Sequence, residues 1–190
     1  MEAKRRTQAK FEGPKNWEAH MAHTAHTAAL FDAACKRDMA RVLAALRDGA
    51  EINARDSNGH TPLMIATYNS RDPSWPLDNP ELDATVASIA GALIAAGAEV
   101  NAAGPEGETA LVRAVMMRRA DAVSVLLAAG ADDHATCEGA LGMSARELAQ
   151  HEGHEATLEA FGRLDLKREL QATLRAGAEA PEPRRRARAL

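Results

Sequence analysis

The segment AGAEVNAAGPEGETAL, residues 96–111, decides the fold because its pattern recurs along the chain. Two further copies are DGAEINARDSNG (residues 48–59) and AGADDHATCEGALG (129–142). Each copy follows a stretch with the apolar spacing of a helix, and a short motif comes soon after it: TPL (61–63), TAL (109–111) or SAR (144–146). Equivalent glycines lie 48 and then 33 residues apart: Gly49, Gly97 and Gly130. The chain therefore reads as repeated helix-turn-helix units.

Each part of the repeated pattern has a physical role in such a unit. Thr61 is a suitable helix cap, and Pro62 is tolerated in the first helical turn. The glycines can close the preceding helix in a left-handed conformation. Small side chains recur where two helices must approach closely: Ala33, Ala34, Ala66, Ala114 and Ala149. The second helix of a unit has an apolar stripe: Leu93, Ile94, Leu126 and Leu127. Stacking of about three or more units is needed to bury these stripes.

The pattern resembles the ankyrin repeat, most closely in TPLMIAT (61–67) and VLLAAGAD (125–132). A spacing of 33 residues is the ankyrin period. The resemblance covers about residues 28–161 and implies an all-α ankyrin-repeat solenoid of about four helix-turn-helix repeats with finger loops and a C-terminal capping helix. The expected boundaries are a polar segment 1–26, repeats within 27–162 (about 28–57, 58–103, 104–136 and 137–162), a capping helix 163–175 and a disordered Arg-rich tail 176–190.

The sequence also departs from the family pattern. The Gly-His pair between the two helices of a repeat is kept at Gly153-His154 but replaced at Arg37-Asp38 and Arg118-Arg119, so we expect these two turns to have another shape. Arg146 takes the place of an apolar residue, which suits a last repeat with one face in water. The second repeat carries an inserted loop, residues 69–79, with Trp75. After this loop, Pro80 should begin a long helix that ends near residue 95.

In ankyrin repeats the finger tips and the ends of the first helices line a concave groove. The matching positions and the inserted loop give the candidate partner-binding residues: Ser57, Asn58, His60, Tyr68, Asn69, Trp75, Met116, Met117, Arg118, Leu141, Met143 and His151. Tyr and Met favour an adaptable apolar interface, although the same side chains could simply pack on neighbouring helices. The flanking arginines could meet an acidic partner segment or form a solvated face: Arg55, Arg113, Arg118 and Arg119. The loop is either functional or a tolerated surface insertion.

Composition narrows the class of protein. The 190 residues are 46% hydrophobic and 26% charged but only 3% aromatic, which favours closely packed helices. A net charge of −4 gives no reason to expect a nucleic acid or an anionic membrane as partner. Cys35 and Cys137 fit no disulfide or zinc pattern. We expect a cytoplasmic protein that is monomeric alone, with no membrane segment, cofactor or metal.

The sequence thus predicts a non-catalytic protein-protein interaction module whose partner is an unidentified protein. One alternative is an inhibitor or immunity-type protein that blocks one specific enzyme. Another is a metal-binding protein or enzyme that uses the N-terminal histidines, since His20, His23 and His26 are spaced to share a helix face. The stretch HEGH (151–154) lacks the spacing of a zinc peptidase, and the sequence has no phosphate-binding loop.

Overall fold

The computed structural model describes the backbone of residues 14–68 and 80–178 and the side chains of residues 24–68 and 80–175. The described chain is mostly helical, as expected. Its helices are α1 (Pro14–Lys36), α2 (Met39–Arg47), α3 (Pro62–Thr67), α4 (Pro80–Ala95), α5 (Ala110–Met116), α6 (Ala120–Ala128), α7 (Ala145–His151) and α8 (Glu155–Ala178). Strands β1 (Thr136–Cys137) and β2 (Met143–Ser144) pair antiparallel, and the short 3-10 helix η1 (Glu138–Ala140) joins them.

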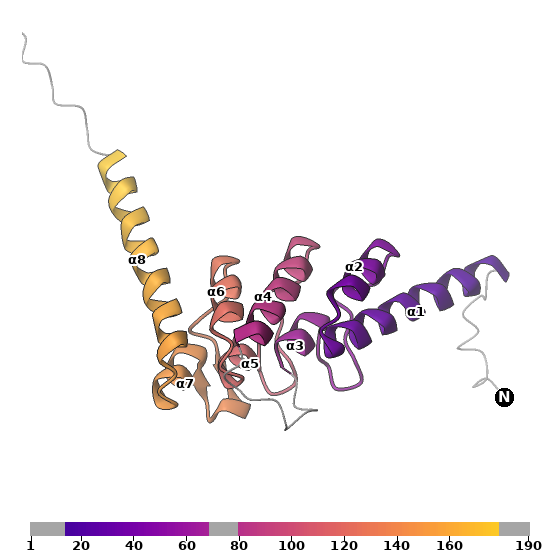
Figure 1. The fold of residues 1–190 in the computed structure, drawn as a ribbon, viewed down its shortest axis with the longest axis horizontal. Helices are drawn as coiled ribbons and strands as arrows, with labels where there is room; N and C mark the ends of the chain where they lie inside the picture. The colour runs from indigo at the N-terminus through magenta and orange to yellow at the C-terminus, as the bar shows by residue number, and fades with distance from the viewer. Residues whose placement is uncertain (1–13, 69–79, 179–190) are drawn as a thin grey trace, which may run out of the picture.

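The helices are arranged in two adjacent rows (Figure 1). One row runs α1, α3, α5, α7, and the other runs α2, α4, α6, α8, each helix packing against the next in its row. The two rows are joined within each consecutive pair, from α1 with α2 to α7 with α8. The alanines expected at close helix contacts are all buried: Ala33, Ala34, Ala66, Ala114 and Ala149. Their small side chains allow the rows to approach, so one continuous core runs through the described stack.

Three helices of the first row begin at the motifs that follow the repeated pattern. The side-chain oxygens of Thr61, Thr109 and Ser144 each accept a hydrogen bond from the backbone N–H three residues later. Glu147 completes a reciprocal capping box with Ser144. The long helix expected after the inserted loop is also confirmed, because α4 runs from Pro80 to Ala95. Local capping chemistry therefore fixes these helix starts.

Loops connect the pairs of helices, and we call them the first finger (residues 48–61), second finger (96–109) and third finger (129–144). Neighbouring fingers are linked by asparagines of the repeated pattern. Asn53 donates to the carbonyl of Gly97 and accepts from the N–H of Glu99. Asn101 makes the same pair of hydrogen bonds with Gly130 and Asp132 in the third finger. This recurrence of Asn fixes the spacing between successive fingers.

The turns within the helix pairs correct one expectation. Arg37 and Arg118 were expected to give differently shaped turns, yet their φ angles of 58° and 56° are close to the 65° of Gly153. The following N–H groups bond back to the preceding helix in the same way at all three places. The surrounding pairs of helices therefore impose the left-handed turn even on arginine, at a cost of about 1 kcal/mol.

The C-terminal end of the stack differs from the expected separate capping helix. Residues 163–175 are instead the continuation of α8, which extends well beyond the other helices (Figure 1). Three leucines on this extension are exposed: Leu166, Leu170 and Leu174. No residue near Gly162 breaks the helix, and glycine alone is tolerated within one, so the two expected helices form one.

Arg146 does not simply face water. Its Nη2 donates to Asp133 Oδ2 at 2.7 Å, and its Nη1 donates to Asp165 Oδ2 at 2.7 Å. The guanidinium also lies over the ring of buried Phe161, 5.0 Å from its centroid. Arg168 donates to the second Asp133 oxygen at 3.1 Å. This network joins the third finger to α7 and α8 and explains why an arginine occupies an otherwise apolar position.

None of the described helices is both long enough and apolar enough to cross a membrane.

Candidate functional site

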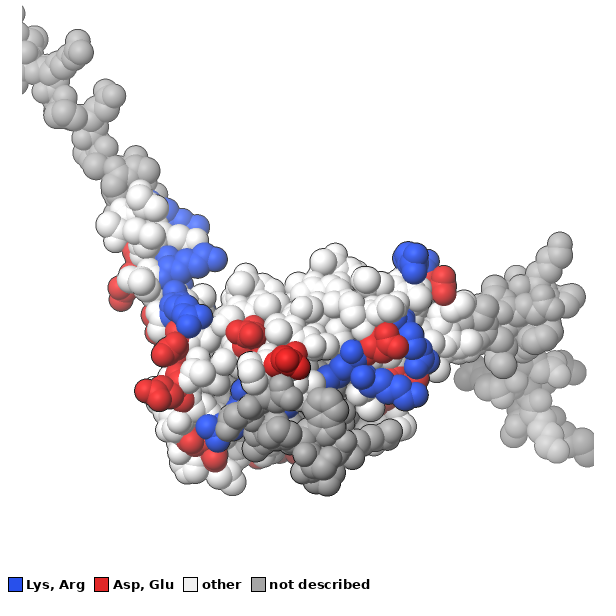
Figure 2. Space-filling model, viewed as in Figure 1, with Lys and Arg blue, Asp and Glu red and all other residues white. Residues whose placement is uncertain are grey.

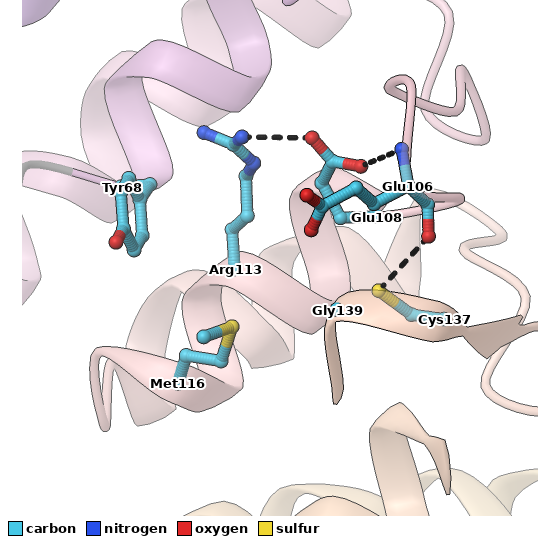
Figure 3. Close-up of a pocket in the computed structure, with 7 residues that line it drawn as sticks. All are labelled: Tyr68, Glu106, Glu108, Arg113, Met116, Cys137 and Gly139. Carbon is cyan, nitrogen blue, oxygen red and sulfur yellow. Dashed lines mark hydrogen bonds and ion pairs between the residues drawn. The ribbon is translucent and has the colours of Figure 1, made fainter. Parts of the chain in front are cut away.

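An open pocket of about 120 Å³ lies where three consecutive units meet (Figure 3). Tyr68 at the end of α3 and Arg113 and Met116 from α5 form one side. The other side consists of residues from the second and third fingers: Glu106, Glu108, Cys137 and Gly139. A volume of this size is several times that of one water molecule, so a side chain of a bound partner fits the scale of the pocket.

Arg113 forms the inner wall of the pocket and is only 7% exposed. Its Nη2 donates to Glu108 Oε1 at 3.0 Å and lies 2.7 Å from His60 Nε2. The guanidinium carbon lies 4.8 Å from the centroid of the Tyr68 ring, a cation–π contact. These contacts hold the charge of Arg113 in place, and its buried Nε has no hydrogen-bond partner among the described residues.

Glu108 is the buried counter-charge of Arg113. Its second oxygen, Oε2, accepts a hydrogen bond from the backbone N–H of Glu106 at 2.9 Å. Burial raises the pKa of Glu108, but hydrogen bonds from backbone N–H groups and from Arg113 outweigh it and hold the pKa below its usual value. The carboxylate therefore remains ionised at neutral pH and neutralises Arg113.

Glu106 is bound to the third finger through its backbone but not through its carboxylate. Its carbonyl accepts the N–H of Glu138 at 3.0 Å and the thiol of Cys137 at 3.5 Å. The side chain extends towards the space between Arg113 and Met116 (Figure 3). Among the residues that the structure describes, its carboxylate makes no ion pair or hydrogen bond. Its Oε2 lies 2.6 Å from the position that a Cβ on Gly139 would take, so any larger residue at 139 would force the carboxylate to move from this place.

Two of the candidate residues, Tyr68 and Met116, come together in this pocket. Met116 is 38% exposed and Leu141 79% exposed. Ser57 and Asn58 are exposed on the first finger, and Arg118 and His151 are exposed at the ends of first-row helices. Met117 and Met143 are half-buried, and Met143 packs against the core. Asn69 and Trp75 lie outside the described residues.

His60 and the flanking arginines need a different interpretation from the one expected. His60 is half-buried, with Nε2 3.1 Å from Glu108 Oε1, so it supports the pocket wall from behind. Arg113 and Arg119 are buried, and Arg55 donates to the carbonyls of Gly59 and Ala103. These three side chains make contacts within the stack, and Arg55 and Arg118 are the exposed members of the set.

Sequence reasoning did not select Cys137 or Gly139 for the site. Two additional residues in the third finger shift its register against the other fingers, so position-by-position comparison placed Leu141 in the groove instead. The signal that could have found Gly139 is the first glycine in CEGALG (137–142), which lies five residues before Ser144 as Gly104 lies five residues before Thr109.

Of the three N-terminal histidines, the structure describes the side chain of His26 alone. His26 lies 4.0 Å from Asp48, and no group of three or more His, Cys, Asp or Glu ligands forms among the described side chains. The side chains of His20 and His23 are outside that part of the structure. No protein-family model matches the chain.

Proposed function

We propose that the chain is a non-catalytic ankyrin-type repeat module that holds a partner protein against the fingers and the ends of the first-row helices. The single observation that carries this proposal is the pocket shared by three successive units, with an aromatic and a methionine side chain at its rim. Binding at a surface formed by packed helices involves little ordering of the protein itself, which favours association.

The ankyrin-type assignment rests on features that recur in register. They are the capped first helices, the left-handed glycines after the second helices and the asparagines that link successive fingers. The two helix rows are what stacked units of this type would produce. In this proposal the stack is a preformed support, and the pocket residues supply the contacts with the partner.

Affinity capture from a native lysate with a matched pair of variants tests the proposed function. The Tyr68→Ala/Met116→Ala variant removes the apolar rim of the pocket. The control Leu43→Ala removes an exposed leucine from α2, away from the pocket. We expect wild type and the Leu43→Ala variant to retain the same protein, and the pocket variant to retain at least about tenfold less of it.

Circular dichroism and thermal unfolding would verify that both variants stay folded. If the folded pocket variant retained the partner as well as the wild type, the proposed surface would be wrong. Absence of any specifically retained protein would argue against the binding function itself.

A further inference from the structure

The charged side chains around the pocket differ in whether they have an ionic partner. Arg113 and Glu108 neutralise each other through a 3.0 Å ion pair in which both side chains are about nine-tenths buried. Glu106 is exposed, and its carboxylate has no partner among the described residues. A ligand that enters the pocket therefore meets one uncompensated negative charge, and a carboxylate or phosphate group would be repelled by it.

The remaining lining is apolar and suits a long side chain. Tyr68 and Met116 lie across the pocket from the fingers, while Cys137 and Gly139 lie below Glu106 (Figure 3). Lysine and arginine combine an apolar stem with a charged end, and they commonly cover apolar surface while keeping the charge in a polar place. Such a side chain can contact Met116 and Tyr68 along its stem and reach the Glu106 carboxylate with its charged end.

We propose that the pocket receives one basic side chain, lysine or arginine, from a segment of the partner protein, and that Glu106 is the residue that selects it. The inference rests on the proposed function and adds the chemistry of the partner to it. Arg113 contributes as a positioning residue, since it fixes Glu108, which in turn accepts the backbone N–H of Glu106.

The surrounding surface agrees with a basic segment. Glu138 on η1 and Glu152 after α7 are exposed, so further carboxylates lie on the units next to the pocket. Figure 2 shows that acidic and basic side chains lie close together at the end of the stack with α1 and α2 and along α8. The attraction for a basic side chain is therefore placed at the pocket itself, where Glu106 is, rather than in the charge of this whole face.

Selection from a display library of random peptides tests the inference, with the full chain as bait. Wild type should enrich peptides that carry Lys or Arg at a fixed position next to apolar residues. Glu106→Gln keeps the size of the side chain but removes the charge, and it should abolish this basic preference. The matched control is Glu138→Gln, which removes an exposed carboxylate from the same finger region but not from the pocket lining, and it should keep the preference.

Binding constants of one enriched peptide sharpen the comparison. Fluorescence anisotropy should give about tenfold weaker binding for Glu106→Gln and for a peptide in which norleucine replaces the basic residue. Gly139→Ala should weaken binding similarly, because its Cβ would displace the Glu106 carboxylate. Circular dichroism of each variant shows that the loss is not unfolding.

The outcomes separate this inference from the proposed function. Enrichment of peptides without a basic position, or equal binding by Glu106→Gln, would overturn the inference while the protein-binding proposal stands. A failure of the wild type to enrich any peptide would also overturn it, and the affinity-capture experiment would then decide the proposed function by itself.

Discussion

At Gly153 the backbone has a φ of 65°, which an L-residue adopts only with strain, and a Cβ added there would meet no atom within 4 Å. Replacement by alanine therefore tests the backbone conformation alone. We expect Gly153→Ala to lower the free energy of unfolding by about 1 kcal/mol. Urea denaturation followed by circular dichroism measures the change.

Gly162→Ala is the control for Gly153→Ala. It lies in the interior of α8, and its Cβ position is also free of contacts. Gly162→Ala should raise the free energy of unfolding by about 0.5–1 kcal/mol, because alanine is the better helix former. If Gly153→Ala also raised the free energy of unfolding, the turn at 153 would not be left-handed in solution.

Helix α6 depends for its first turn on a residue from another element. Its own capping position, Arg119, makes no side-chain cap, and Asp83 of α4 accepts the N–H groups of Asp121 at 2.9 Å and Ala122 at 3.3 Å instead. Loss of this buried acceptor in Asp83→Ala should lower the free energy of unfolding by about 1–2 kcal/mol. The control Glu81→Ala changes an exposed acidic residue in the same first turn of α4, and it should lower the free energy of unfolding by less. Equal effects in urea denaturation would contradict a specific role of Asp83.

The sequence could predict those helix starts that depend on interactions between residues close together in the chain. The starts of α3 and α4 follow from Thr61, Pro62 and Pro80, whose capping chemistry acts within a few residues. The cap that Asp83 gives to α6 lies 38 residues away in the chain and exists only because the two helices pack together. Likewise, Tyr68 and Met116 could be selected by repeat position, but Gly139 could not, since its proximity to Glu106 joins two fingers and exists only in the folded stack.

The Arg146 network affects the whole molecule, because it joins the third finger, α7 and α8. Asp133 is buried, with a side chain only 2% exposed, and its ionised form relies on Arg146 and Arg168. Arg146→Leu restores the apolar residue of the other units but leaves Asp133 with one of its two cations. We expect a loss of about 2–3 kcal/mol in the free energy of unfolding at neutral pH.

The dependence of this loss on pH follows from the pKa of Asp133. Burial raises that pKa, but hydrogen bonds from Arg146 and Arg168 outweigh it and hold the pKa below its usual value of about 3.9. The stabilisation is therefore complete above the unfolded pKa and is lost as the pH falls through the folded pKa. The difference between wild type and Arg146→Leu should shrink when urea denaturation is repeated below about pH 3.

Arg163→Leu is the control, because its exposed ion pair with Glu159 on α8 should contribute less than about 0.5 kcal/mol at either pH. In a stack whose units contact only their neighbours, the damage should also remain local. Amide hydrogen exchange should therefore become faster in α7 and α8 of the Arg146→Leu variant and stay nearly unchanged in α2 and α3. Uniformly faster exchange would mean that the stack unfolds as one unit. In the urea experiments, a loss of stability that does not depend on pH would mean that Arg146 acts through its packing on Phe161 rather than through its charge.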